Sequence, residues 1–172
     1  MTIILGVDPG SRKTGFGILR AERGHAVYVA SGTIRLPVKE SLAARLNVLF
    51  SALTEIIDTY RPTEAAIEQV FMAKSADSAL KLGHARGAAM VACVTQGVVV
   101  HEYAARQIKQ SVVGTGAATK QQVQHMVVAL LGLSEAPAED AADGLAAALC
   151  HCHAAGLSAA LAASSFRAGR LR

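Results

Sequence analysis

The order of strand-like and helix-like segments constrains the fold of this sequence more than any other feature. Three apolar, strand-like runs at residues 3–7, 14–19 and 25–34 follow one another with only turns between them. Further along the chain, strand-like runs at 65–70 and 97–101 alternate with helix-like segments. A three-strand meander followed by alternating helices and strands predicts an α/β fold with a central five-stranded mixed sheet flanked by helices.

Four segments are predicted to be helical, namely residues 42–60, 78–96, 120–131 and 139–155. Ser41 is placed to cap the first helix, and Thr119 with Gln122 forms a capping box at the start of the third. Gly132 is expected to end the third helix and Gly156 the fourth, because glycine favours the helix terminus.

The length of 172 residues suits one domain, predicted at residues 1–156, followed by a flexible basic tail at 157–172. With 52% hydrophobic and 17% charged residues, the chain can bury a core and is not disordered. No segment approaches the roughly 20 apolar residues needed to span a bilayer, and the first residues lack the features of a signal peptide. Three cysteines are too few for a disulfide framework, so we expect a cytoplasmic protein.

The charges are unevenly distributed along the chain. Residues 69–134 carry six basic side chains against two acidic ones. The basic residues are Lys74, Lys81, Arg86, Arg106, Lys109 and Lys120. This basic block is consistent with a solvated surface, or with binding to nucleic acid. Carboxylates elsewhere would repel phosphate unless metal cations lay between the two.

Four acidic residues are candidates for such a metal site: Asp8, Glu68, Asp140 and Asp143. Asp8 follows the first strand, and the pair Asp140 and Asp143 shares one face of the last helix. Each of these three also has an ordinary explanation, in a turn or at a helix N-terminus. Glu68 has none, because it lies inside an apolar strand, where a glutamate is costly unless it is paired or bound to a metal.

Four carboxylates that converge would suit hydrolysis of a phosphodiester with two divalent cations. Oxygen ligands favour Mg²⁺, with Mn²⁺ as a substitute, over zinc. Two such ions about 3.5–4 Å apart activate water on one side of the phosphate and stabilise the leaving oxygen on the other. We therefore expect the four acids to share one cation site.

Six segments together resemble the RuvC family, the bacterial crossover (Holliday) junction endodeoxyribonucleases. They are residues 8–17, 67–71, 74–82 with 85–87, 102–109, 113–116 with Lys120, and 140–143. The resemblance implies an RNase H-like nuclease domain, a homodimer, and Mg²⁺-dependent paired nicking of four-way junction DNA in recombination and repair. It also implies 5′-phosphate and 3′-hydroxyl ends, and the branch-migration proteins RuvA and RuvB as partners.

By position in these segments, the resemblance makes Asp8, Glu68, Asp140 and Asp143 the metal ligands. Lys109 and Lys120 match basic residues near the scissile phosphate, where either would stabilise charge in the transition state. The residues expected to contact DNA are Phe71, Lys74, Lys81, Arg86, Lys109 and Lys120. Without the resemblance, Phe71 would be read as a core residue and the lysines as solvated.

Two competing functions fit part of the sequence. A non-catalytic nucleic-acid-binding module would explain the basic block but leave Glu68 unexplained. An RNA-strand nuclease of the same fold would use the same acids. The turn after Asp8 also resembles the phosphate loop of actin-like ATPases and sugar kinases, which need two such lobes.

Other chemistry-bearing residues are given ordinary roles. The segment 150–153 alternates cysteine and histidine, but Cys150 and Cys152 lie two apart on a helix and cannot share one zinc ion. His84, His101 and His125 are interpreted as surface or packed histidines. Gly83 and Gly87 lie one helical turn apart and would let a second helix approach, within the subunit or across a dimer.

Overall fold

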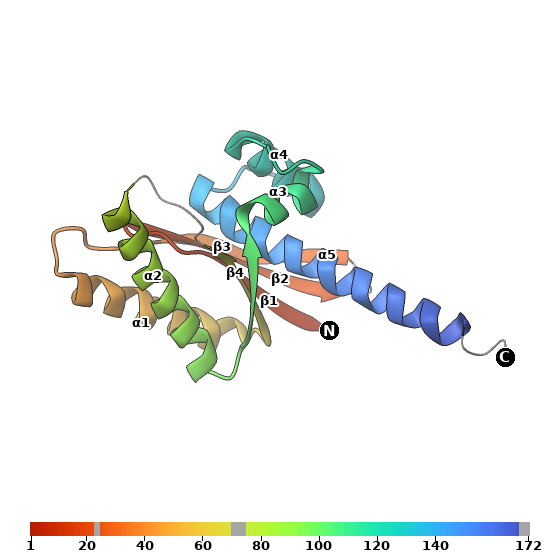
Figure 1. The fold of residues 1–172 in the computed structure, drawn as a ribbon, viewed down its shortest axis with the longest axis horizontal. Coiled ribbons are helices and arrows are strands. Elements are labelled where there is room, and N and C mark those ends of the chain that lie inside the picture. Colours follow the sequence, from red (N-terminus) through yellow and green to blue (C-terminus); the bar gives the residue numbers. More distant parts are fainter. Residues whose placement is uncertain (23–24, 70–74, 169–172) are drawn as a thin grey trace.

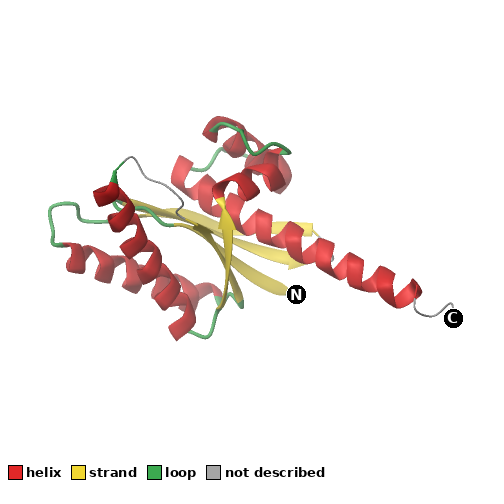
Figure 2. Cartoon of the chain, viewed as in Figure 1, coloured by secondary structure: helices red, strands yellow, loops and turns green. Residues whose placement is uncertain are grey.

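The computed structural model describes residues 1–22, 25–69 and 75–168. Within these ranges the chain forms one sheet and the helices around it (Figures 1 and 2). The strands are β1 (Thr2–Asp8), β2 (Lys13–Glu22), β3 (His25–Arg35), β4 (Glu64–Gln69) and β5 (Val99–Ala104). The helices are α1 (Leu42–Tyr60), α2 (Ala76–Thr95), α3 (Ala105–Val113), α4 (Lys120–Leu131) and α5 (Glu139–Ala168).

The five strands run in the order β3-β2-β1-β4-β5. The first three form the antiparallel meander that the sequence predicts, and β4 and β5 add to β1 as parallel strands. The predicted five-stranded mixed sheet is therefore confirmed. Parallel pairing has one consequence for function, since the carboxyl ends of β1, β4 and β5 lie at the same edge of the sheet.

Helices cover both faces of the sheet. Helices α1 and α2 pack on one face and α5 crosses the other, where α3 and α4 pack against it in turn (Figure 1). Side chains alternate accordingly, so Leu5 and Val7 of β1 contact the α1–α2 core while Ile4 contacts the α5 core. In β4, Ala65 and Ile67 face α1 and α2, and Ala66 faces α5.

The predicted helix caps are confirmed at two helices. The Ser41 hydroxyl accepts a hydrogen bond from the Ala44 N–H at the start of α1, at 3.2 Å. At α4, the Thr119 hydroxyl accepts from the N–H of Gln122, whose side chain accepts from the Thr119 N–H. Gly132 ends α4 in the left-handed conformation that glycine adopts readily.

Two helices differ from the prediction. Helix α5 continues through Gly156 to Ala168, so residues 157–168, predicted as part of a flexible tail, are helical. One glycine costs a helix only about 1 kcal/mol, and the alanine-rich segment that follows favours the helix. Helix α3 was not predicted, because Ala104 at its N-cap offers no side-chain cap. Within the described ranges, no helix is long and apolar enough to cross a membrane.

Candidate active site

Asp8 and Glu68 are neighbours because of the pairing between β1 and β4. Val7 lies opposite Ile67 in this parallel pair, so Asp8 and Glu68 are the next residues at the carboxyl ends of the two strands. Val7 and Ile67 face α1 and α2. Alternation along the strands therefore directs both carboxylates to the opposite face, under α5.

Small residues let α5 lie very close to this face. A Cβ atom on Gly6 of β1 would overlap the carbonyl oxygen of Gly144 in α5, and one on Gly15 of β2 would overlap the carbonyl oxygen of Asp140. Gly15 is paired with Asp8 across the sheet. The first turns of α5, which carry Asp140 and Asp143, are thus held beside the end of β1.

The carboxylates interact strongly enough to change their acidity. Burial, followed by the charge of Asp143 and then Asp140, raises the pKa of Asp8 to about 6, although Lys120 opposes the change. Burial and then the charges of Asp8 and Asp143 raise the pKa of Glu68 to about 7. Burial also raises the pKa of Asp143. The structure therefore brings the four acids into one electrostatic cluster at the sheet edge.

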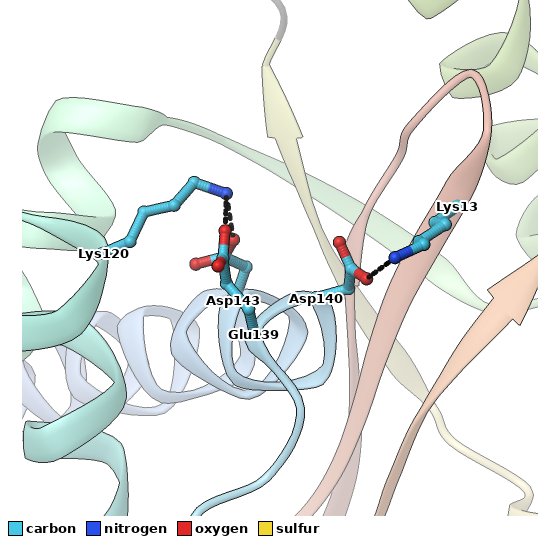
Figure 3. A network of polar contacts seen from close by, with 5 residues as sticks. All are labelled: Lys13, Lys120, Glu139, Asp140 and Asp143. Carbon is cyan, nitrogen blue, oxygen red and sulfur yellow. Dashed lines mark hydrogen bonds and ion pairs between the residues drawn. The ribbon is translucent and has the colours of Figure 1, made fainter.

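Lysine side chains reach into this cluster (Figure 3). The Lys120 ammonium lies 3.1 Å from Asp143 and 2.8 Å from Glu139, and Lys13 lies 3.8 Å from Asp140. The hydrogen bond to Glu139 is the main reason that the pKa of Lys120 is raised. In this arrangement, the ammonium groups balance part of the negative charge.

Glu139 and Lys13 were not predicted as site residues. Glu139 precedes Asp143 by four residues on α5, so the helical spacing that related Asp140 to Asp143 also places Glu139 on the same side. Lys13 opens β2, opposite the strand that ends in Asp8. Both positions were visible in the sequence, but lysine and glutamate at the surface are too common to be singled out.

Basic side chains also surround a hollow next to the acids. It has a volume of about 680 Å³. Its lining includes Arg12 from the turn before β2, Lys13 at the start of β2, Arg35 from β3 and Asp140 from α5. A hollow with this lining offers a place for a negatively charged group beside the acidic cluster. Neither Arg12 nor Arg35 was predicted as a site residue.

The predicted DNA-contacting residues fall into three groups. Lys120 lies in the cluster, and Lys109 is close enough to oppose the raised pKa of Glu68. Lys81 pairs with Asp77 on the same helix at 2.5 Å, and Arg86 pairs with Glu102 of β5. Phe71 and Lys74 lie outside the described residues.

The donor set fits a hard divalent cation. All four predicted ligands are carboxylates, half-buried and mutually repulsive, which is the environment that a divalent cation neutralises. Among the described residues, no three of these carboxylates have oxygen atoms that all lie within 4.8 Å of one another. In the described part of the chain, only Glu64, His101 and His151 have ligand atoms that all lie within 4.8 Å of one another.

Comparison with known proteins identifies relatives along nearly the whole chain. The family model for crossover junction endodeoxyribonuclease RuvC matches residues 4–151. The protein named crossover junction endodeoxyribonuclease RuvC of Saccharophagus degradans is 59% identical over 172 residues, 99% of each chain. The protein of the same name in Teredinibacter turnerae is 63% identical to this chain over 155 residues, 88% of each chain.

Solved structures agree with this relationship. Thermus thermophilus RuvC in complex with a Holliday junction substrate superposes with a TM-score of 0.85 at 32% identity, covering 92% of this chain and 97% of that one. The free Thermus thermophilus protein gives a TM-score of 0.82, also at 32% identity, covering 91% and 96% of the two chains. This family of nucleases implies a divalent metal ion at the active site. The chain belongs to the RuvC family of crossover junction endodeoxyribonucleases.

Proposed function

We propose that this protein resolves four-way DNA junctions by two symmetric nicks, which leave 5′-phosphate and 3′-hydroxyl ends, during recombination and repair. One observation carries the proposal. Asp8, Glu68 and Asp143, distant in the sequence, share one half-buried cluster with Lys120 at the edge of the sheet. Binding to DNA alone would not require buried carboxylates, since they repel phosphate.

The proposed ligands for divalent cations are Asp8, Glu68, Asp140 and Asp143. We propose two Mg²⁺ ions per subunit, for which Mn²⁺ can substitute, because an all-oxygen donor set with about four negative charges matches two such cations. When bound, these ions would supply activation of the attacking water and stabilisation of the leaving 3′ oxygen. The burial of Asp8 and Glu68 keeps their negative charge poorly solvated, so cation binding is favoured.

Lys120 and Lys109 are proposed to act on the phosphate. Lys120 lies 3.1 Å from Asp143 and 2.8 Å from Glu139, whose side chain is exposed. An ammonium group at this place would stabilise the extra negative charge that develops on the phosphate oxygens as water attacks. We propose the same role for Lys109 of α3, whose positive charge acts on the carboxylate of Glu68.

The remaining contacts with DNA are proposed for Phe71, Lys74, Lys81 and Arg86. Phe71 would act on the bases near the crossover, and Lys74 would contact the backbone close to it. Lys81 and Arg86 lie on α2 and pair with carboxylates in the free protein. Phosphates of the junction would take the place of those carboxylates, and such exchanges make binding dependent on salt.

A homodimer is proposed because a four-way junction has twofold symmetry and needs two cuts related by it. Helix α2 offers a surface for the second subunit. Its exposed apolar residues Leu80, Val91 and Val94 lie on one stripe, and a Cβ atom added to Gly83 or Gly87 of the same helix would meet nothing within 4 Å. The two glycines would allow the α2 helices of two subunits to approach closely.

The proposed cellular setting follows from the substrate. Four-way junctions of a bacterial chromosome lie in the cytoplasm, and the three cysteines are free and buried. RuvA and RuvB, which bind and move such junctions, are the proposed partners. These partners come from family membership rather than from a surface on this chain.

The experiment that tests the proposal uses a mobile and an immobile synthetic four-way junction, with and without Mg²⁺. We expect symmetric paired nicks only with the metal, and ends that a ligase reseals. The variant Asp8→Asn should bind the junction but not cleave it. A protein that binds without cleaving under all conditions would be a nucleic-acid-binding module. Preferred cleavage of the RNA strand in an RNA–DNA hybrid would indicate an RNA nuclease instead.

A further inference from the structure

Side chains of the types that ligate metals also gather on the same face of the sheet as the acids but away from them. Glu64 begins β4, His101 lies in β5 and His151 lies in α5. One ligand atom from each of these three residues lies within 4.8 Å of the other two. The three elements that meet here therefore present a carboxylate and two imidazoles to one point.

This group is separate from the acidic cluster. Glu64 precedes Glu68 by four residues on the same strand, which corresponds to about 13 Å. His151 follows Asp143 by eight residues on α5, which corresponds to about 12 Å. Helix α5 runs antiparallel to β4, so Asp143 lies near Glu68 at one end of the strand and His151 lies near Glu64 at the other. No ion at the acidic cluster could therefore also contact the second group.

His151 is held in place by both of its ring nitrogens. Its side chain is only 5% exposed, and its Nε2 lies 2.5 Å from a carboxylate oxygen of Glu64. On the other side, Nδ1 lies 2.7 Å from the hydroxyl of Tyr103 in β5. A ligating histidine in a metal site usually has such a partner on its second nitrogen, which fixes the direction of the ring.

The other two side chains are accessible. The side chain of His101 is 40% exposed and that of Glu64 is 32% exposed, and the His101 Nε2 lies 3.7 Å from the Glu64 carboxylate. The rings of His101 and His151 stack with their centroids 4.3 Å apart. An ion can therefore reach the Glu64 carboxylate and the His101 ring from solvent.

We propose that Glu64, His101 and His151 bind one transition-metal ion of the Zn²⁺ class, independently of the nuclease site. Two imidazole nitrogens and one carboxylate oxygen select Zn²⁺, Co²⁺ or Ni²⁺ over Mg²⁺. Three protein ligands leave a fourth position for water at the exposed side. The ion would tie α5 to β4 and β5, the elements that also carry Asp140, Asp143 and Glu68.

The protons balance without a further reactant. Either ring nitrogen of a neutral imidazole can carry its single proton, and only a deprotonated Nε2 can bind an ion. In that form of His151 the proton lies on Nδ1, which then donates to the Tyr103 oxygen 2.7 Å away. A proton displaced from Nε2 is released to solvent and Nδ1 takes up another, so the neutral ring carries one proton before and after the ion binds. Tyr103 is therefore a positioning residue, and loss of its hydroxyl should weaken binding by about 10-fold or more.

The test is a titration of the metal-free protein with Co²⁺ in excess Mg²⁺, followed by calorimetry and by visible absorption. We expect one Co²⁺ per subunit with a spectrum of nitrogen and oxygen ligands, and a higher thermal unfolding midpoint. The variants His101→Gln and Glu64→Gln should each bind at least about 100-fold more weakly, since loss of an outer partner alone costs about 10–100-fold.

Controls separate this site from others. His125→Gln changes an exposed histidine of α4 and should bind Co²⁺ as the unchanged protein does. Asp8→Asn should also retain the Co²⁺ site, so failure of the nuclease proposal would not affect the result. Absence of Mg²⁺-resistant Co²⁺ binding would overturn the inference, and so would equal binding in His101→Gln and Glu64→Gln. Thiolate absorption bands would show that the buried cysteines bind the ion instead.

Discussion

Replacing Asp8 by asparagine should stabilise the metal-free protein while abolishing cleavage. The carboxylate is half-buried next to Asp143 and Asp140, which raises its pKa from 3.8 to about 6. Such a change corresponds to about 3 kcal/mol of unfavourable free energy in the folded state when Asp8 is ionised. Solvent screening and the burial of asparagine itself reduce the expected gain at about pH 8 to roughly 1–3 kcal/mol.

The gain should depend on pH with a definite sign. The folded protein holds the Asp8 proton more tightly than the unfolded chain does, because the folded pKa is the higher one. The stability that this proton provides is present below the unfolded pKa and is lost as the pH rises through about 6. At about pH 4.5 the advantage of Asp8→Asn should therefore fall to about 1 kcal/mol or less.

The assay is urea unfolding in the presence of a chelator, at about pH 8 and about pH 4.5, repeated with Mg²⁺. Added Mg²⁺ should stabilise the unchanged protein more than the variant, because only the unchanged protein keeps the full set of ligands. Asp58→Asn is the matched control, since Asp58 is a surface residue with a side chain 50% exposed. If Asp8→Asn lowers the free energy of unfolding at both pH values, the idea of a repulsive acidic cluster is refuted.

Three further changes test other parts of the account. Lys120→Gln should slow single-turnover junction cleavage by about 100-fold with little change in junction affinity; an unchanged rate would remove Lys120 from the reaction. Gly144→Ala should destabilise the fold by about 1–3 kcal/mol, because the added Cβ would meet the backbone of β2. Gly156→Ala in the same helix should stabilise the fold by up to about 1 kcal/mol. Thermal unfolding of the two variants measures both changes. If the proposed dimer forms through α2, Val91→Glu on α2 should shift it towards monomer in analytical ultracentrifugation, and Leu130→Glu on α4 should not; a dimer that Val91→Glu leaves intact would place the interface elsewhere.

The sequence predicts the parts of this fold that depend on local patterns. The strands and the caps at Ser41 and Thr119 depend on neighbouring residues, and these predictions are confirmed. Helix α3 was not predicted because it follows β5 directly and has no capping side chain at its N-cap residue. Its start is instead stabilised by the Gln107 side chain, which accepts a hydrogen bond from the N–H of Ala104 at 2.9 Å. The end of α5 was predicted too early because a single glycine does not determine whether an alanine-rich helix stops or continues.

In the candidate site, too, the residues with a local sequence pattern were predicted and those without one were not. The sequence predicted that Asp8, Glu68, Asp140 and Asp143 would converge. Each position has a recognisable sequence pattern: Asp8 at the end of a strand, Glu68 within an apolar strand, and Asp140 with Asp143 on one face of a helix. The roles assigned to these residues and to the lysines remain predictions. The group of Glu64, His101 and His151 leaves no such pattern, since it depends on the register of β4 with β5 and on how far α5 extends across them.

The most direct measurement is the anomalous scattering of Mn²⁺ in crystals of the protein with junction DNA. The account predicts Mn²⁺ peaks among the carboxylates of positions 8, 68, 140 and 143, next to the phosphate that is cut. Peaks at any other group, with these four carboxylates paired only to lysines, would contradict the claim that they form one divalent-cation site.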